Sequence, residues 1–168
     1  MSIRICAAQA ADVPAILAIY NEAVLNTTAS YDYEPHTLDQ RLAWFEQHQK
    51  QGFAVLVAMN EADQVVGWGS LSKFREKIGY QYSVEHSLYV AAEHRRRGIG
   101  RLILQALIES ARARGAHVLI GGVDASNGAS IALHQALGFE AVAHFKQVGY
   151  KFNHWLDLVF MQLIVSDS

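Results

Sequence analysis

A short basic turn at residues 94–100 has the residue types and the spacing that bind phosphate groups. Three consecutive arginines, Arg95 to Arg97, precede the sequence Gly98-Ile99-Gly100. An apolar, strand-like run ends just before this turn, and a helical segment follows it. A turn that opens a helix presents free backbone N–H groups and the positive end of the helix dipole. The sequence therefore predicts an anion site here, and a diphosphate fits it best.

Other phosphate-binding and catalytic motifs do not match this chain. A P-loop requires Lys followed by Ser or Thr after its last glycine, whereas Arg101-Leu102 follows Gly100. A Rossmann fingerprint requires a glycine or alanine three residues further on, and this position is Ile103. The eight histidines show no paired spacing such as H-E-x-x-H, so we expect no metal. The G-x-S-x-G elbow of serine hydrolases is also lacking.

The composition is typical of one folded domain spanning residues 1–168, with 51% hydrophobic and 18% charged residues. The formal net charge of −2 argues against a general nucleic-acid binder, so the arginine cluster indicates a local anionic ligand. Cys6 is the only cysteine, which excludes a disulfide framework and a thiolate metal site. The N-terminus does not resemble a signal peptide, and no run reaches the roughly 18 to 20 apolar residues of a membrane span. We therefore expect a soluble cytoplasmic protein without membrane contact.

Hydrophobic periodicity predicts both helices and strands. The expected strands are 2–8, 53–59, 65–72, 80–91, 118–123, 139–148 and 155–165, and the expected helices are about 11–26, 37–52, 98–114 and 126–137. Gly67 and Gly69 alternate within one strand, which indicates a close approach to its backbone. The loop at 26–36 carries Tyr31 and Tyr33, which either contact a substrate or pack on the edge of the core. An antiparallel meander followed by βα units predicts an α+β or mixed α/β layer fold.

Local capping signals mark several helix ends. Asp12 and Thr37 are the expected N-caps of the first two helices, and Pro14 fits the first turn. The helix 98–114 is expected to close at Gly115, and Gly138 fits the left-handed C-cap of the helix 126–137.

The arginine-glycine turn and a second landmark together resemble the GCN5-related N-acetyltransferase (GNAT) superfamily. The turn is similar to its Q/R-x-x-G-x-G/A motif, which binds the coenzyme A pyrophosphate. Asn127 opens a helix that ends in Leu137-Gly138-Phe139, similar to the superfamily's second landmark. The resemblance covers nearly the whole chain in the right order. It implies a central, mostly antiparallel twisted sheet of about seven strands, splayed at the cofactor site and flanked by about four helices.

Further segments resemble the phosphinothricin and methionine sulfoximine acetyltransferase group. They are Lys73-Phe74-Arg75, Gly79-Tyr80, the strand 84–90 and the run 148–157. Members of that group acetylate the α-amine of small amino acids and form homodimers. The resemblance implies direct attack on acetyl-CoA in a ternary complex, with an acceptor similar to methionine sulfoximine, methionine sulfone or phosphinothricin. It also implies a homodimer.

The resemblance assigns the acetyl-CoA contacts to three segments. The implied cofactor residues are Leu88, Tyr89, Val90, Arg95, Arg96, Arg97, Gly98, Ile99, Gly100, Arg101, Asn127 and Ser130. In the resembled fold the pantetheine arm pairs with residues 88–90, and the Val90 N–H can polarise the thioester carbonyl. One such oxyanion donor contributes about 3 to 4 kcal/mol of transition-state stabilisation. Asn127 either bonds to the pantetheine amides or is only a helix N-cap.

Two residues are candidates for proton transfer. Glu85 lies on the strand that leads to the thioester site, where partial burial would raise its pKa towards that of a useful base. The alternative is a structural Glu85 paired with Arg75 or Lys73. His134 stands where many superfamily members have a tyrosine that protonates the leaving thiolate. An imidazolium could do so, solvent could do so instead, or His134 is a histidine on the helix surface. His86 faces away from Glu85 and is expected to be structural.

The predicted acceptor pocket combines a cationic segment with part of one strand. The implied substrate residues are Lys73, Phe74, Arg75, Tyr82, Ser83, Val84 and Glu85. Arg75 offers a bidentate fork for a carboxylate, although composition alone would make residues 73–77 a solvated charge run. Two other functions stay open: acetylation of a protein N-terminus or polyamine, and a non-catalytic acyl-CoA sensor. A polyamine would favour an acidic pocket, and a sensor would need neither Glu85 nor residues 73–75.

Overall fold

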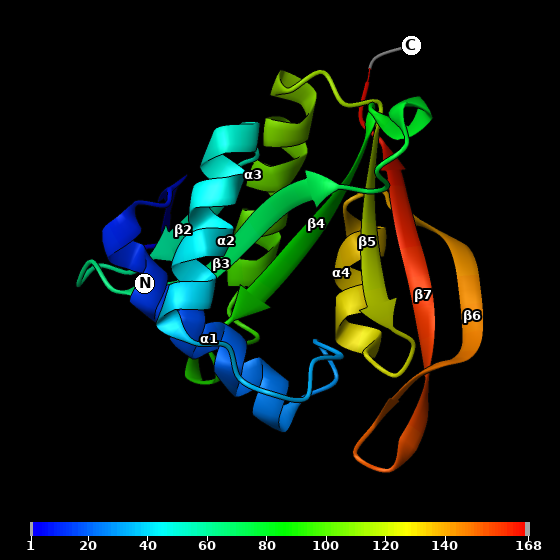
Figure 1. Ribbon diagram of the computed structural model, residues 1–168, viewed down its shortest axis with the longest axis horizontal. Coiled ribbons are helices and arrows are strands. Elements are labelled where there is room, and N and C mark those ends of the chain that lie inside the picture. Colours follow the sequence, from blue (N-terminus) through cyan, green and yellow to red (C-terminus); the bar gives the residue numbers. More distant parts are fainter. Residues whose placement is uncertain (1, 167–168) are drawn as a thin grey trace.

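A seven-stranded sheet organises the chain in the computed structural model, which describes residues 2–166 (Figure 1). The strand order is β1-β2-β3-β4-β5-β7-β6, and all neighbours are antiparallel except β4 with β5. The strands are β1 (Arg4–Ala7), β2 (Val55–Met59), β3 (Val65–Lys73), β4 (Ser83–Val90), β5 (Val118–Asp124), β6 (Glu140–Lys151) and β7 (His154–Ile164). The α-helices are α1 (Val13–Asn26), α2 (Leu38–Gln51), α3 (Ile99–Ala113) and α4 (Gly128–Ala136). The predicted mixed α/β fold is confirmed.

Local hydrogen bonds explain where the first two helices begin. The Thr37 hydroxyl accepts from the Gln40 N–H at 3.2 Å, and the Gln40 side chain accepts from the Thr37 N–H at 2.8 Å. This capping box starts α2 at the predicted residue. Asp12 does not cap α1, because its carboxylate accepts from the Gln9 N–H at 2.8 Å. That bond fixes a short 3-10 turn, Ala10–Asp12, ahead of the helix.

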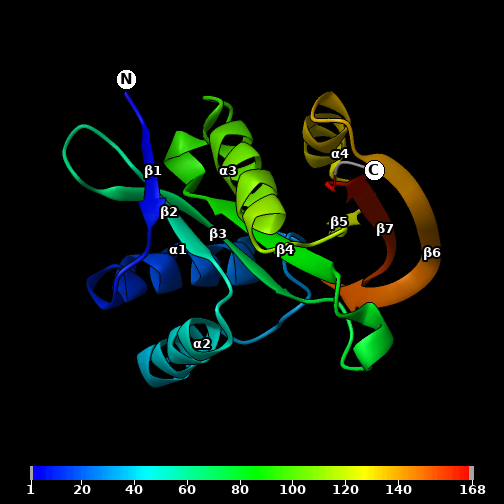
Figure 2. The same cartoon turned by 90° about the horizontal axis from the view of Figure 1, so that it is seen from above.

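Helices cover both faces of the sheet. Figure 2 shows α1 and α2 on one face and α3 with α4 on the other. Helix α3 approaches β3 closely at Gly67 and Gly69, where a Cβ on Gly69 would lie 2.8 Å from Ile103 Cγ2 and from Leu107 Cδ1. The predicted close approach to this strand is confirmed, and the approaching element is α3. On the other face, Trp68 fills the core beneath α1 and α2.

Strands β4 and β5 are joined only over their first halves. Their parallel pairing covers three positions and ends at Glu85, opposite Ile120, after which the strands diverge (Figure 1). The Ala91 N–H donates to a carbonyl of β3. Because N–H direction alternates along a strand, the N–H groups of Val90 and Leu88 point away from β3 and into the gap. The sheet therefore has free backbone donors in its interior.

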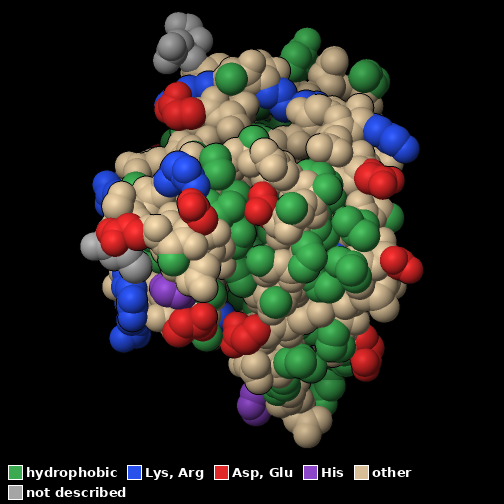
Figure 3. All heavy atoms as spheres, turned by 90° about the vertical axis from the view of Figure 1, so that its left-hand side faces the viewer, with side chains coloured by type: hydrophobic (Ala, Val, Ile, Leu, Met, Phe, Trp, Pro, Cys, Tyr) green, Lys and Arg blue, Asp and Glu red, His purple; other side chains and the backbone are tan. Residues whose placement is uncertain are grey.

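Within residues 2–166, no helix has both the length and the apolar character needed to cross a membrane. Figure 3 shows one face of the molecule, on which acidic and basic side chains are mixed with hydrophobic ones. This face does not present charge of a single sign.

Candidate active site

The basic turn forms one end of a cleft of about 780 Å³. Arg96 and Gly98 have positive φ angles of 61° and 79°, and α3 begins at the next residue. The free N–H groups of the first turn of this 15-residue helix therefore lie at the cleft. The predicted cofactor residues that line the cleft are Leu88, Tyr89, Val90, Arg95, Arg96, Gly98, Ile99, Gly100, Arg101, Asn127 and Ser130. Arg97 is the one predicted cofactor residue that lies outside the lining.

The arginines of the turn have different surroundings. Arg95 is held by protein groups, because its guanidinium pairs with Glu22 at 2.7 Å and its Nε donates to the last carbonyl of β4 at 3.1 Å. It therefore connects the turn to α1 and to β4. Arg96 and Arg101 line the cleft and are the side chains best placed to contact a bound diphosphate.

Asn127 fits both of its predicted roles. Its Oδ1 accepts from the Ser130 N–H at 3.1 Å, so Asn127 is the N-cap of α4. That bond uses the oxygen only, and the Nδ2 group remains a donor. Because Asn127 also lines the cleft, this nitrogen is available to an amide carbonyl of a bound ligand.

A second cavity, of about 450 Å³, meets the cleft at the gap between β4 and β5. Leu88, Tyr89 and Asn127 line both spaces. Gly122 of β5 also lines the second cavity, and its missing side chain keeps the space beside the gap open. A group held in the cleft can therefore reach the second cavity, which we call the acceptor cavity.

Glu85 and Arg75 both line the acceptor cavity. Burial raises the pKa of Glu85 above its ordinary value, and the charge of Arg75 lowers it in part. Among the described residues no ion pair holds Glu85, since Lys73 pairs with Glu76 at 3.4 Å and Arg75 contacts the Phe74 carbonyl at 3.5 Å. Among the described residues, neither Arg75 nor Lys73 therefore forms an ion pair with Glu85 in this structure. A partly buried carboxylate without a fixed partner can take a proton from a bound ammonium.

His134 is buried in the protein, with 3% of its surface exposed. Its Nδ1 donates to the Ser130 carbonyl at 2.7 Å, so its Nε2 accepts from His86 Nε2 at 2.9 Å. Burial lowers the pKa of His134, and burial together with the neighbouring His134 lowers the pKa of His86 to about 3. Both rings are neutral at pH 7. The one N–H of His134 is bound to the Ser130 carbonyl, so His134 has no free N–H to donate to a leaving thiolate. The surface alternative was wrong, and the structure contradicts an imidazolium acid.

Most of the predicted substrate residues lie outside the cavity lining. The five residues outside it are Lys73, Phe74, Tyr82, Ser83 and Val84. Val84 packs in the core beside α3, because neighbours on a strand point to opposite faces and Glu85 takes the cavity side. Tyr82 precedes β4 and is 60% exposed. Phe74 does not line the cavity itself, but its ring packs edge-on against Phe160, which does.

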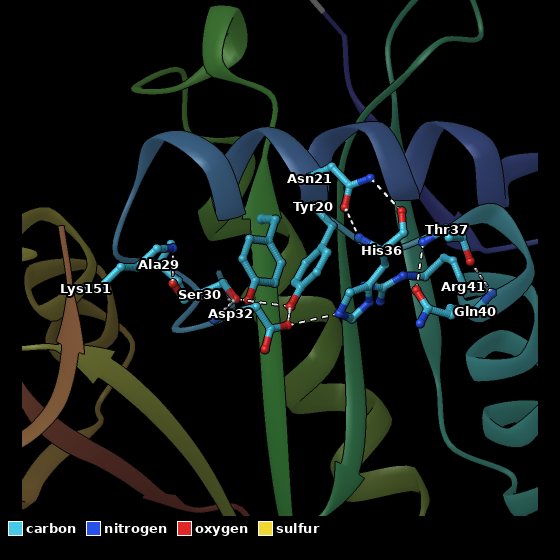
Figure 4. A network of polar contacts seen from close by, with 11 residues as sticks. Tyr20, Asn21, Ala29, Ser30, Asp32, His36, Thr37, Gln40, Arg41 and Lys151 are labelled. Atoms are coloured by element: carbon cyan, nitrogen blue, oxygen red, sulfur yellow. Dashed lines mark hydrogen bonds and ion pairs between the residues drawn. The ribbon is translucent and has the colours of Figure 1, made fainter. Parts of the chain in front are cut away.

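The loop between α1 and α2 forms a wall of the acceptor cavity, and Tyr31 and Tyr33 were its only signal in the sequence. The residues of this loop that line the cavity are Thr28, Ala29, Ser30, Tyr31 and Asp32. Figure 4 shows how they are held: the Tyr20 hydroxyl bonds to Ser30 and Asp32, and His36 pairs with Asp32 at 3.1 Å. The buried Arg41 guanidinium lies 3.1 Å from His36 Nδ1.

Asp124, at the end of β5, is a cavity residue that the sequence did not reveal. It is 6% exposed, its Oδ1 accepts two bonds from Ser126, and its Oδ2 has no partner among the described residues. The cavity thus holds three carboxylates, of Asp32, Glu85 and Asp124, against one arginine. This balance suits a ligand with both an ammonium and a carboxylate. Within residues 2–166, no three His, Cys, Asp or Glu side chains gather closely enough to hold a metal ion.

Residues 16–139 match the model of the Acetyltransferase (GNAT) family. The chain is 49% identical over 163 residues to the L-methionine sulfoximine/L-methionine sulfone acetyltransferase of Pseudomonas aeruginosa. This match covers 97% of this chain and 95% of that protein.

Solved structures of similar proteins have the same fold. The ribosomal-protein-alanine N-acetyltransferase of Brucella melitensis is 52% identical, with a TM-score of 0.93 over 96% of this chain and 99% of that one. A phosphinothricin acetyltransferase of the GNAT superfamily from Sinorhizobium meliloti, in complex with acetyl-CoA, is 36% identical. Its TM-score is 0.95, and the match covers 98% of this chain and 89% of that one.

Proposed function

The chain belongs to the acetyltransferase (GNAT) family, and from this premise we propose that it transfers the acetyl group of acetyl-CoA to the α-amine of a small amino acid. The observation that carries the proposal is the presence of Glu85 and Arg75 in a cavity that meets the cofactor cleft. An α-amino acid offers a carboxylate to Arg75 and an ammonium to Glu85. Methionine sulfoximine, methionine sulfone and phosphinothricin are the proposed acceptors, because similar proteins are named for them.

The residues of the cleft fit acetyl-CoA, which supplies the acetyl group as a reactive thioester. The backbone N–H groups of the turn, with Arg96 and Arg101, would hold its diphosphate. The N–H groups of Leu88 and Val90, which have no partner strand on the gap side, would pair with the pantetheine arm. The Nδ2 group of Asn127 would donate to one of the arm's amide carbonyls.

Three groups of the chain contribute to acetyl transfer. Arg75 binds the acceptor's carboxylate, and Glu85 removes a proton from its ammonium, so that the free amine can attack the acetyl carbon directly. The Val90 N–H stabilises the negative charge that develops on the acetyl oxygen, a contribution of about 3 to 4 kcal/mol for one well-placed donor. The thiolate takes its proton from solvent, because the Nδ1–H of His134 is bound to a backbone carbonyl.

A protein N-terminus is the second candidate acceptor, because one similar structure is a ribosomal-protein-alanine N-acetyltransferase. The first residue of a protein has no free α-carboxylate, so Arg75 would have no partner in that complex. Polyamines would suit the three carboxylates of the cavity, but they too offer nothing to Arg75. An acyl-CoA sensor would need neither Arg75 nor a partly buried Glu85.

A panel of acceptors tests the proposal. Thiol release from acetyl-CoA is measured with methionine sulfoximine, methionine sulfone, phosphinothricin, an alanine-initiated peptide and spermidine. We expect turnover with at least one of the free amino acids and much slower release with the peptide and spermidine. Tight coenzyme A binding without turnover of any free amino acid would refute the proposal. Faster turnover of the peptide would favour the second candidate.

A homodimer located in the cytoplasm is also part of the proposal. Strand β6 lies at the edge of the sheet and is exposed along most of its length. Its exposed apolar side chains include Val142, Phe145 and Tyr150, and Trp155 of β7 lies beside them. An exposed apolar edge strand favours burial against a second copy. A monomer in analytical ultracentrifugation at micromolar concentration would contradict the dimer, and cell fractionation tests the location.

A further inference from the structure

The tip of the β6–β7 hairpin carries an aromatic residue in an unfavourable conformation. Phe152 and Asn153 both have positive φ angles, 51° and 60°. Such two-residue turns favour Asn and Gly, and a bulky residue with positive φ is a genuine outlier. The Phe152 side chain is also 52% exposed. Neither backbone conformation nor burial favours phenylalanine here, and strain of this kind concentrates at functional sites.

Phe152 lines the cofactor cleft. The rest of that lining comes from the end of α1 with its following loop, from β4, from the arginine-glycine turn and from α4. The hairpin thus contributes an aromatic side chain to a cleft whose other walls also carry apolar side chains, among them Leu88, Val90 and Leu133. An exposed aromatic ring in this position offers contact area to an apolar part of a ligand.

The hairpin tip is fixed in place by the residue before Phe152. Lys151 is 3% exposed, and its ammonium donates to the carbonyls of Thr27 at 2.8 Å and Ser30 at 2.7 Å. Figure 4 shows this side chain extending from the hairpin to the loop that follows α1. The same ammonium lies 5.1 Å from the centre of the Phe152 ring. Lys151 therefore holds the ring against the cleft.

A second contact fixes the same hairpin against the same loop. The ring of Tyr31 packs directly on Gly149, where a Cβ would lie 2.6 Å from Tyr31 Cε2. The Tyr31 hydroxyl donates to the Asp157 carbonyl at 3.2 Å, and the Tyr33 hydroxyl donates to the Tyr150 carbonyl. The position of the hairpin tip is therefore determined on both sides of Phe152.

We propose that Phe152 is a cofactor-binding residue that packs against the pantetheine arm of acetyl-CoA, and that Lys151 is its positioning residue. This rests on the proposed function for the identity of the ligand. Lys151 anchors the tip to residues 27–30, and Thr28 and Ala29 line both the cleft and the acceptor cavity. The tip therefore lies at the end of the cleft nearest the acceptor, where the arm must pass. The nucleotide belongs at the other end, with the arginine-glycine turn.

Phe152→Ala tests this assignment by direct binding. Coenzyme A affinity is measured by isothermal titration calorimetry, and we expect about a tenfold weaker affinity from the loss of a half-exposed aromatic contact. The KM for the amino-acid acceptor should stay unchanged. The matched control is Val148→Ala, an exposed apolar residue of the same hairpin that lines neither space, and it should leave coenzyme A affinity unchanged. Equal affinity of Phe152→Ala and the wild type would overturn the proposal.

S-acetylpantetheine, which lacks the nucleotide, identifies the part of the cofactor involved. We expect Phe152→Ala to lower kcat/KM by the same factor for acetyl-CoA and for S-acetylpantetheine as donors. A loss confined to acetyl-CoA would place the ring against the nucleotide and overturn the assignment to the arm. Calorimetry with coenzyme A does not require turnover. If the wild type binds coenzyme A but acetylates no amino acid, the proposed function is refuted, while the role of Phe152 in coenzyme A binding can still be tested.

A double-mutant cycle separates positioning by Lys151 from a general structural role. Lys151→Met keeps a long apolar stem but removes both hydrogen bonds from the ammonium. If Lys151 acts through Phe152, adding Phe152→Ala to Lys151→Met should weaken coenzyme A binding by less than twofold further. A full tenfold additional loss would show that Lys151 does not position the ring.

Discussion

Replacing Glu85 by glutamine removes the proposed base while keeping the size of the side chain and its capacity for hydrogen bonds. A positioned general base contributes about 10²- to 10⁴-fold to a rate. At about 1.4 kcal/mol per factor of ten, this corresponds to roughly 3 to 6 kcal/mol of barrier. We take the middle of this range, because Glu85 has no ion-pair partner among the described residues that could share its role. We therefore expect Glu85→Gln to lower kcat by about 10³-fold.

The pH dependence gives the sharper measurement for this variant. A base must be deprotonated to act, so the rate rises with pH until the carboxylate of Glu85 is fully ionised. Burial raises the pKa of Glu85, which places this rise at higher pH than for an exposed glutamate. Initial rates at saturating acetyl-CoA, measured from pH 5 to 9, should show the rise in the wild type and lose it in Glu85→Gln.

Arg75→Gln provides a matched comparison for the same experiment. The charge of Arg75 lowers the pKa of Glu85, so its removal should shift the rise to higher pH without abolishing it. An unchanged kcat and pH profile in Glu85→Gln would refute Glu85 as the base. A rise that remains in Glu85→Gln and still responds to Arg75→Gln would assign the titration to another group near Arg75.

Three further predictions concern binding and stability. Arg75→Ala should raise the KM for the amino acid about 10- to 100-fold through the loss of charged hydrogen bonds, while the KM for acetyl-CoA stays within twofold; the reverse pattern would place Arg75 on the cofactor. Gly69→Ala should lower the free energy of unfolding by about 1 to 3 kcal/mol in urea, because its Cβ would meet Ile103 and Leu107 of α3, and an unchanged value would contradict the close packing. The pKa of His86 is about 3 in the folded protein, so the unfolded chain binds one more proton between that pH and its ordinary value. Stability should therefore fall by about 1.4 kcal/mol per pH unit as pH drops below 6.5, and His86→Gln should lack that contribution in urea titrations at several pH values.

Most parts of the fold that depend on local sequence were predicted well, although Asp12 does not cap α1 as expected. Thr37 and Gln40 stand three residues apart, so their reciprocal bonds could be expected from the sequence. The glycines of β3 likewise indicated the close approach of another element, although not that α3 would be the one. Both features depend on residue types within a few positions of one another.

The acceptor cavity was predicted less well, because its walls come from distant segments. Alternation along β4 shows that Glu85 and Val84 face opposite ways, but it does not show which face borders the cavity. The loop after α1 is held by Lys151, whose partner Ser30 lies 121 residues away in the chain. The burial of His134 depends in the same way on His86 of another element. Contacts between residues so far apart in the sequence cannot be predicted from local hydrophobic periodicity.

The divergence of β4 and β5 has a consequence for the mechanics of the whole sheet. Only three residue pairs connect the backbone of strands β1–β4 to that of β5–β7, so few backbone hydrogen bonds join the two halves of the sheet at this seam. A pantetheine arm paired with Leu88 and Val90 would add hydrogen bonds to the free backbone groups of β4 at this seam. A ligand present at a hundred times its Kd adds about 2.7 kcal/mol to the stability of the folded state. Protein that retains coenzyme A and protein stripped of it should therefore differ in stability. Amide hydrogen exchange of residues at the seam should measure this difference.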